Sequence, residues 1–406
     1  MIKRIGALAF IFVCTSIAWI ILGSTIFSRT ESPLSGELKS RVAGNWGTEQ
    51  QQSPPKATYQ HEFTRTEEDG KETKQTKASE TISLPLEATK ADVTLGLDYR
   101  QKGLLWYSTY TVAFRGDYSF TNSSGQDQDL TFQLCFPSQQ AIYDDLVMSV
   151  DNQALTVKNT NASILGTARV AAGKTAVLHA GYRSRGLDSW RYDFGKGVSQ
   201  IRNFTLNVRT NFKGIDFPEN TISPTTKRET DKGWDLTWNY TNLVSGYAIG
   251  ITMPQKLQPG PLAGQISFFA PVSLFFFFFL MFIITTLRGI NLHPMNYFFL
   301  AAAFFAFHLL LVYLVDHVSI HIAFGICSLV SIFLVVSYLR LVVGMRFAAM
   351  EAGFAQLIYL ILFSYAFFFK GFTGLAVTIG SIVTLFVIMQ MTGRINWEEK
   401  FAKAKS

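Results

Sequence analysis

Two hydrophobic patterns divide the 406 residues of the chain. In the first, unbroken apolar runs of about 20 residues occur once near the N-terminus and five times in the last third. A helix of ~20 residues crosses the ~30 Å hydrocarbon core of a bilayer and pairs its own backbone polar groups there. This pattern predicts an integral membrane protein with a bundle of five C-terminal transmembrane helices, at residues 265–287, 295–315, 320–339, 348–369 and 372–391.

The first apolar run, residues 5–27, follows Lys3 and Arg4. A cleaved signal peptide has a shorter apolar core, ~7–15 residues, and ends in small residues at its cleavage site. This run is long enough to span a bilayer, and its end carries only a weak cleavage signal. We therefore expect an uncleaved transmembrane anchor over residues 1–27, with a cleaved signal peptide as the alternative.

Positive charges beside the helix ends predict the orientation, because loops rich in Lys and Arg stay in the cytoplasm. Lys3 and Arg4 then place the N-terminus inside, and six crossings return the C-terminus to the cytoplasm. Cations in the other segments expected inside agree with this: Arg288, Arg340, Arg346, Arg394, Lys400, Lys403 and Lys405. Lys370 is the discordant charge, and its side chain can snorkel to the interface. The net charge of +7 fits these flanking cations rather than nucleic-acid binding.

The second pattern fills residues 28–262, where apolar and polar positions alternate. Leu130, Phe132 and Leu134, for example, alternate with polar residues. A period of two indicates a strand with one buried and one wet face. Many short strands with turn residues between them predict an antiparallel β-sandwich-like domain. We expect strands at 93–99, 110–120, 130–136, 146–150, 176–182, 204–208 and 234–240.

Two polar stretches of this domain are expected to lack regular structure. Residues 28–56 end in a run of Gln, Ser and Pro and resemble a linker. Residues 67–80 are charged and nearly free of apolar side chains, which is typical of an exposed loop. The predicted organisation is an anchor at 1–27, a periplasmic β-rich domain with its linker at 28–262, a five-helix transmembrane domain at 263–392 and a cytoplasmic tail at 393–406.

Signatures of common enzymes are absent from the sequence: it contains no HExxH, GxSxG, P-loop or CxxC pattern. We therefore expect no enzymatic activity, no cofactor and no bound metal. Cys135 is the single cysteine of the β-rich domain, so no disulfide can form within it. Residues 188–194 mix acids, Arg191 and aromatic side chains. They could line a ligand groove, but aromatic strand residues more often belong to a core, which is the interpretation we favour.

Three histidines and one acid of the membrane part are candidates for chemistry. His317 and His321 have helical spacing beside Asp316 and would suit a divalent metal. We favour polar residues that cap two helix ends. His308 and Glu351 fall inside apolar runs, where a proton relay or ion path would use them. The structural alternatives are a hydrogen bond between helices for His308, and a headgroup-level position for Glu351.

Several short motifs carry a family resemblance. Leu292-His293-Pro294-Met295-Asn296-Tyr297 precedes the third predicted helix, and Leu314-Val315-Asp316-His317 ends it. Tyr338-Leu339 and Arg394-Ile395-Asn396-Trp397 follow, and Asn45-Trp46-Gly47 precedes Gln and Pro residues. The first two segments resemble the LHPMxY and (L/S)(E/D)H motifs of the CreD family of bacterial inner-membrane proteins. Tyr338-Leu339 and Arg394-Ile395-Asn396-Trp397 resemble the pattern that closes the family's sequence, and Asn45-Trp46-Gly47 resembles its WG…Q…P segment.

The resemblance implies an N-terminal anchor, a periplasmic domain and a C-terminal helical block. It also implies a role in cell-envelope integrity, with two-component control in some bacteria and links to colicin tolerance and β-lactam response. It brings no established catalytic residue; the family motif positions have no assigned role: His293, Pro294, Met295, Tyr297, Asp316, His317, Asn396 and Trp397. Pro294 suits the first turn of a helix, whereas His293 and Tyr297 suit the headgroup zone.

These observations lead to two hypotheses about function. The first is a non-enzymatic inner-membrane protein that supports envelope integrity or an envelope stress response. Its β-domain would bind a periplasmic or inner-membrane protein or another envelope component. The alternative is a transporter or channel that uses the region of His308 and His317.

The topology can be tested by labelling cysteines with a membrane-impermeant reagent. Cysteines placed near Gly125 and Lys370 should react in intact cells, because these positions are expected outside. Cysteines near Arg288, Arg346 and Ser406 should react only after lysis. Labelling at Ser406 in intact cells would exclude the six-helix topology.

Overall fold

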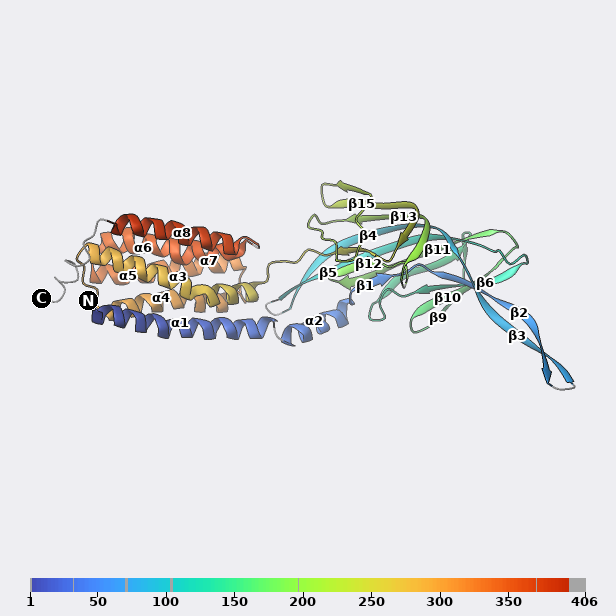
Figure 1. The fold of residues 1–406 in the computed structure, drawn as a ribbon, viewed down its shortest axis with the longest axis horizontal. Coiled ribbons are helices and arrows are strands. Elements are labelled where there is room, and N and C mark those ends of the chain that lie inside the picture. The colour runs from blue at the N-terminus through green and yellow to red at the C-terminus, as the bar shows by residue number, and fades with distance from the viewer. Residues whose placement is uncertain are drawn as a thin grey trace. The chain divides into compact units, whose positions relative to one another are not determined.

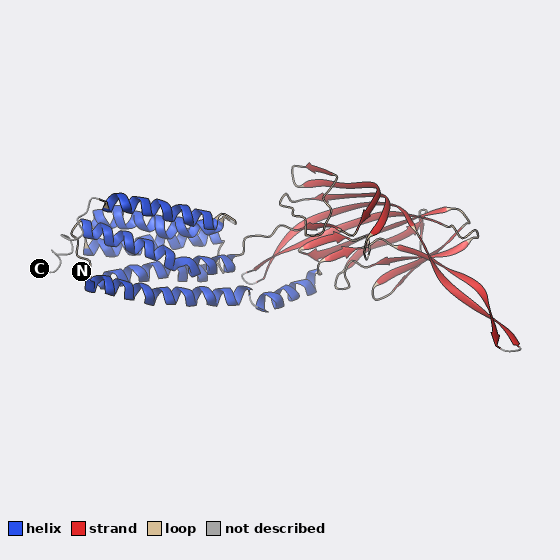
Figure 2. Cartoon of the chain, viewed as in Figure 1, coloured by secondary structure: helices blue, strands red, loops and turns tan. Residues whose placement is uncertain are grey.

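A computed structural model describes residues 2–31, 33–69, 72–102, 105–195, 197–369 and 371–393 of the chain. The chain forms two compact units, one built of helices and one of strands (Figures 1 and 2). The helical unit comprises Met1–Glu37, Gly103–Leu105 and Leu257–Ser406, and the β-rich unit comprises Leu38–Lys102 and Trp106–Lys256.

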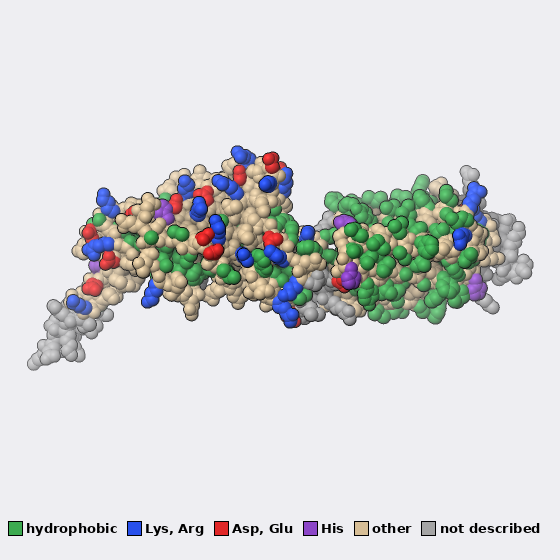
Figure 3. Space-filling model, turned by 180° about the vertical axis from the view of Figure 1, so that it is seen from behind, with side chains coloured by type: hydrophobic (Ala, Val, Ile, Leu, Met, Phe, Trp, Pro, Cys, Tyr) green, Lys and Arg blue, Asp and Glu red, His purple; other side chains and the backbone are tan. Residues whose placement is uncertain are grey.

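Six helices of the described part are long and apolar enough to cross a bilayer, which confirms the N-terminal apolar helix and the five C-terminal ones. Hydrophobic side chains cover the visible face of the helical unit (Figure 3). The continuous helices are α1 (Ile2–Glu31), α3 (Pro259–Leu287), α4 (Pro294–Leu314), α5 (Ile320–Val342) and α8 (Thr373–Thr392). The remaining span, Phe347–Phe368, consists of η1 (Phe347–Ala352), α6 (Gly353–Gln356), η2 (Leu357–Leu362), α7 (Phe363–Tyr365) and η3 (Ala366–Phe368).

Close approach and aromatic packing hold the helical unit together. The backbones of α1 and α3 meet at Gly23, where an added Cβ would lie 2.8 Å from the Cα of Phe268. Such small residues allow helices to pack tightly in lipid, where association lacks a hydrophobic driving force. Between α3 and α4, the rings of Phe277 and Phe304 lie 4.6 Å apart.

Buried polar side chains of the helical unit find partners across the bundle. Ser331 Oγ of α5 donates to the Ala303 carbonyl of α4 at 2.9 Å, and Gln356 Nε2 donates to Ser331 Oγ at 2.7 Å. Tyr359 OH donates to Thr384 Oγ1 of α8 at 2.9 Å. Each bond satisfies a group that would otherwise be unpaired in an apolar interior.

Within the described residues, the strands of the β-rich unit form three sheets. The eight-stranded sheet has the order β14 (Thr226–Glu229), β15 (Trp234–Ser245), β13 (Ser199–Thr210), β4 (Leu86–Lys102), β5 (Leu105–Thr121), β11 (Thr175–Leu187), β7 (Tyr143–Val150) and β8 (Gln153–Ala154). The five-stranded sheet has the order β3 (Glu72–Leu84), β2 (Lys56–Asp69), β6 (Gln128–Cys135), β10 (Ser163–Val170) and β9 (Val157–Asn159). The three-stranded sheet has the order β1 (Gln50–Gln52), β12 (Ser189–Tyr192) and β16 (Ile249–Thr252).

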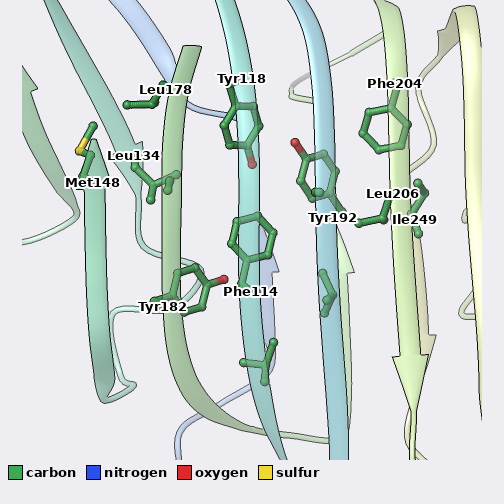
Figure 4. Close-up of a cluster of buried hydrophobic side chains, with 14 of the residues drawn as sticks. Phe114, Tyr118, Leu134, Met148, Leu178, Tyr182, Tyr192, Phe204, Leu206 and Ile249 are labelled. Atoms are coloured by element: carbon green, nitrogen blue, oxygen red, sulfur yellow. The ribbon is translucent and has the colours of Figure 1, made fainter. Parts of the chain in front are cut away.

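The three sheets share one hydrophobic core (Figure 4). Phe120 of the eight-stranded sheet meets Phe132 of the five-stranded sheet edge to face at 5.8 Å. The strands expected from alternation all form, in β4, β5, β6, β7, β11, β13 and β15. Most pairings are antiparallel, but β13 runs parallel to β4, and β1 runs parallel to β12.

The linker expected at residues 28–56 is wrong. After α1, the chain forms helix α2 (Pro33–Trp46) and strand β1. Lys39 of α2 lies 2.6 Å from a carboxylate oxygen of Asp188, and this contact raises the pKa of Lys39. The polar composition misled the prediction because α2 docks through charged and aromatic contacts rather than through an apolar face.

Strand β1 is polar and yet buried, because its glutamines have partners inside the β-rich unit. Gln50 Nε2 donates to Ser184 Oγ and to a backbone carbonyl, each at 2.8 Å. Gln52 accepts from the Tyr182 hydroxyl at 2.8 Å. An amide side chain can enter a core when protein groups engage its donors, as for Gln50, or its acceptor, as for Gln52.

The exposed loop expected at residues 67–80 is also wrong. Strands β2 and β3 pair as a hairpin from Ala57 and Leu84 out to Asp69 and Glu72. Because β2 pairs with β6 only over residues 56–58, the rest of the hairpin is a two-stranded arm, as Figure 1 shows. Backbone pairing needs no apolar side chain, and residues 61–64 are exposed on both faces of the ribbon, so such a strand escapes a search for alternation.

Contacts with neighbouring strands explain two residues of the segment Asn45-Trp46-Gly47, namely Trp46 and Gly47. The guanidinium groups of Arg100 and Arg185 lie 4.2 Å and 4.7 Å from the ring of Trp46, on which both can form cation–π contacts. Gly47 has φ 94°, and an added Cβ would collide with the carbonyl oxygen of Arg185. Glycine therefore permits both the backbone conformation and the close approach.

Replacing Gly47 with alanine should destabilise the β-rich unit more than the same change at Gly125. Both residues have positive φ, 94° and 75°, so alanine strains each backbone by roughly 1–2 kcal/mol. Only at Gly47 does the new Cβ also meet a carbonyl oxygen, since nothing lies within 4 Å at Gly125. Thermal unfolding of the purified protein, followed by near-ultraviolet circular dichroism, should give a lower midpoint for Gly47→Ala. Equal midpoints in the two variants would contradict the steric argument.

Candidate functional site

The first motif positions of the membrane part build the start of helix α4. His293 is the N-cap, and its ring Nδ1 accepts a hydrogen bond from the Met295 backbone N–H at 3.3 Å. Pro294 occupies the first helical position, where a missing N–H has no consequence. Met295 is half exposed. These three residues therefore act as a helix-start signal.

Tyr297 lies in the core of the helical unit, in the first turn of α4. Its side chain is fully buried, and its ring meets Phe278 edge to face at 5.5 Å. It shares a helical face with the buried Leu300, Ala301 and Phe304, which explains its depth. The neighbouring Asn296 accepts a hydrogen bond from the Tyr338 hydroxyl at 2.8 Å, which joins two family segments distant in sequence.

Asp316 and His317 are exposed at the end of α4. The His317 backbone N–H donates to the Leu314 carbonyl at 3.0 Å, and the ring of His321 packs on Phe368 at 5.2 Å. Within the described ranges, no three His, Cys, Asp or Glu side chains gather as a metal site. Some sequence predictions fall outside the described residues, namely those on Lys370, Arg394, Asn396, Trp397, Lys400, Lys403 and Lys405.

His308 is fully buried between α1 and α4. Its ring Nδ1 lies 2.9 Å from the Phe304 carbonyl of its own helix, so the hydrogen bond expected between helices is wrong. The rings of Trp19 and Phe307 surround it at 5.7 Å and 5.0 Å. Its Nε2 has no hydrogen-bond partner among the described residues. An i−4 carbonyl is always within reach of a helical side chain, which explains why the local bond forms.

Glu351 is paired rather than free at the headgroup level. Its Oε1 lies 2.5 Å from Nη2 of Arg288, so the ion pair joins the C-terminal end of α3 to η1. The Glu351 side chain is 16% exposed and that of Arg288 is 56% exposed. His293, Pro294 and Glu351 thus hold helix ends in place.

A more open site lies in the β-rich unit. Strands from all three sheets border a cleft of about 810 Å³, here called the aromatic cleft. Its walls include the rings of Phe120, Tyr192, Phe194 and Phe204. Phe194 lies 5.6 Å from Tyr192 and 5.0 Å from Phe204, measured between ring centroids. Such a volume and apolar lining are typical of small-molecule sites.

Polar groups also line the aromatic cleft. The buried hydroxyl of Tyr192 points toward that of Tyr118 (Figure 4), with which it forms a hydrogen bond, and Thr89 is its other hydrogen-bond partner. Burial raises the pKa of both hydroxyls, so both stay protonated and can donate. At the rim, Lys56 and Arg202 are exposed cations.

The sequence located this cleft only in part. Residues 188–194 were interpreted as core, and Trp190 and Tyr192 are indeed buried. Tyr192 and Phe194 nevertheless line the cleft, which was the alternative. The other walls come from residues 53–56, 83–89 and 199–204, and no local pattern indicates that these distant segments meet.

Comparison with known proteins identifies one family. The family described as inner membrane protein CreD matches residues 1–398. No curated protein matches. Among solved structures, the chain is similar to a candidate nutrient-binding protein from Legionella pneumophila, with 9% identity and a TM-score of 0.35. That match covers 57% of this chain and 76% of the other.

An M1 zinc metallopeptidase from Deinococcus radiodurans is also similar, with 13% identity and a TM-score of 0.27. The match covers 42% of this chain, which spans only 42% of the metallopeptidase's length. Identities and TM-scores this low carry no conclusion about function.

Removing one partner of the Arg288–Glu351 pair should have unequal effects. Arg288→Gln leaves the less exposed Glu351 without its cation and should lower the free energy of unfolding by roughly 2 kcal/mol. Glu351→Gln leaves Arg288, which is more exposed, free to hydrate and should cost less. The double variant should recover part of the loss. Thermal unfolding in detergent measures all three, and additive losses in the double variant would contradict a direct pair.

Proposed function

The chain belongs to the CreD family of inner-membrane proteins, and from this premise we propose that it supports cell-envelope integrity without being an enzyme. In this proposal, the β-rich unit faces the periplasm and binds an envelope component or a protein partner. The helical unit anchors it in the inner membrane, with both termini in the cytoplasm. A role in the response to envelope stress follows if binding reports on the state of the envelope.

The aromatic cleft is the observation that carries this proposal. Its volume of about 810 Å³ lies within the ~300–1,000 Å³ common for ligand sites. Aromatic walls supply apolar contact area, and the exposed cations Lys56 and Arg202 supply charged groups at the rim. A hollow that combines aromatic walls with a few polar groups favours recognition of a bound molecule.

Charge supports the periplasmic orientation. Arg288 follows α3, whereas Arg340 and Arg346 flank the end of α5. Two crossings, α4 and α5, separate the two segments and so bring them to the same side of the membrane. Loops rich in Lys and Arg stay in the cytoplasm. The β-rich unit follows the first span and precedes the second, so it lies on the opposite side.

The helical unit gives no support to the transporter or channel alternative. His308 bonds to its own helix among aromatic rings, and His317 lies exposed in a turn. Ser331, Gln356 and Tyr359 form bonds that tie helices together. The proposal that the protein is not an enzyme rests on the sequence, which lacks the motifs named above.

Site-specific photocrosslinking in intact cells tests this function. A photoreactive phenylalanine analogue at Phe194, in the cleft wall, should capture a defined envelope component. The same analogue at Phe63 is the matched control, because Phe63 is 40% exposed on the β2–β3 arm and does not line the cleft. Mass spectrometry of the products should identify one component enriched at Phe194. Identical products at both positions would argue against a specific cleft ligand.

A further inference from the structure

A second hollow lies on the solvent face of the eight-stranded sheet, apart from the aromatic cleft. It has a volume of about 650 Å³ and is here called the charged cradle. Strands β4, β5, β7, β11 and β13 contribute its residues. Its floor consists of the small residues Thr94, Ala113 and Gly181. Its border carries charged or titratable side chains: Arg115, Arg183, Arg209, Asp92, Asp117, Asp145 and His179. Figure 3 shows Lys, Arg, Asp and Glu side chains gathered on one face of this unit.

Strand register explains how these residues come together. On one side of the cradle, β13 pairs with β4, so that Arg209 lies opposite Thr94. On the other side, β5 pairs with β11, so that Ala113 lies opposite Arg183. In the middle, Thr111 Oγ1 of β5 donates to the Gly96 carbonyl of β4 at 3.3 Å, which places these two strands side by side.

One row of side chains therefore crosses four strands. Antiparallel pairing of Gly96 with Thr111 puts Thr94 opposite Ala113, two residues further along. The row then reads Arg209, Thr94, Ala113, Arg183. With ~4.8 Å between strands, the two arginine backbones stand roughly 14 Å apart over a trough of small side chains.

The adjacent row supplies a third arginine. Arg115 lies two residues from Ala113 along β5, on the same face of the sheet, and opposite Gly181 of β11. Gly181 has no side chain, so the space beside Arg115 stays open. Arg115, Arg183 and Arg209 thus border one hollow from three strands, and the sheet holds their backbones in fixed positions.

Each acid of the cradle already has a partner within it. Asp92 accepts from Asn207 Nδ2 at 3.0 Å, and Oδ1 of Asp117 lies 2.7 Å from Nδ1 of His179. Oδ2 of Asp145 lies 3.1 Å from Nη1 of Arg183. The carboxylates are therefore engaged by groups on neighbouring strands.

Two of the three arginines are not compensated in this way. Among the described residues, no acid lies within ion-pair distance of Arg115 or Arg209. Both side chains are exposed at the border of the trough. A guanidinium group presents a planar fork of donors that matches the two oxygens of a phosphate or carboxylate.

We propose that the charged cradle binds a ligand through an oxyanion group, a phosphate or a carboxylate, which Arg115 and Arg209 hold over the trough. The hydroxyl of Thr94, which lies next to Arg209 in its row, is a further donor. The remainder of the ligand is polar, because it faces the Arg183–Asp145 and His179–Asp117 pairs. This site requires neither the aromatic cleft nor its ligand.

Binding of simple anions to the full-length protein in detergent tests this proposal. Sodium phosphate and sodium acetate are titrated at constant ionic strength against sodium chloride, and the unfolding midpoint is recorded. A ligand that binds the folded state raises the midpoint as its concentration exceeds Kd. We expect a saturable rise with phosphate or acetate. The stronger of the two identifies the class of oxyanion.

Arginine variants distinguish binding at the charged cradle from nonspecific binding of anions to a cationic protein. Arg115→Gln and Arg209→Gln should each weaken the binding at least tenfold, and the double variant should abolish it. Arg169→Gln is the matched control, because Arg169 is an arginine of the same unit, 66% exposed and outside the cradle. It should leave the affinity unchanged.

A second measurement, ³¹P nuclear magnetic resonance, does not depend on the thermal stability of the protein. The ³¹P signal of phosphate should broaden when the wild-type protein is added and stay sharp with the double variant. The proposal is overturned if neither anion raises the midpoint beyond chloride. It is equally overturned if the double variant binds as tightly as the wild type in both measurements.

Discussion

A buried polar group needs a partner, and this requirement shapes both units. In the helical unit, each helix pairs its own backbone, and side chains such as Ser331 and Gln356 then bond to each other across the bundle. In the β-rich unit, the same requirement lets a polar strand enter the interior. Gln50 and Gln52 are almost fully buried because β11 offers them a serine hydroxyl, a carbonyl and a tyrosine hydroxyl.

Both candidate sites lie in the β-rich unit rather than at the motif residues of the membrane part. Those motif residues are used internally: His293 caps a helix, and Asn296 binds Tyr338. The aromatic cleft, by contrast, combines the rings of Phe194 and Phe204 with exposed cations at its rim. Arg115 and Arg209 border a hollow whose acids have partners within it.

Failures of the sequence predictions have a common physical cause. Polar composition indicated a linker at 28–56 and a loop at 67–80, but both segments contain regular structure. A pattern search detects the contrast between a wet and a dry face, and it is blind where both faces are wet, as at residues 61–64 of the β2–β3 arm. It is equally blind where polar side chains are buried, as in β1.

The sequence by itself determined the membrane class, the six apolar helices and the alternating strands, because length and periodicity in one segment suffice for each. It also determined the family, through short motifs. Only the tertiary structure decided which strands are neighbours and which side chains they bring together. Arg209, Thr94, Ala113 and Arg183 form one row, because strand order and register join four strands from different parts of the sequence. Pairing between distant strands is a property of the whole fold, and no local pattern encodes it.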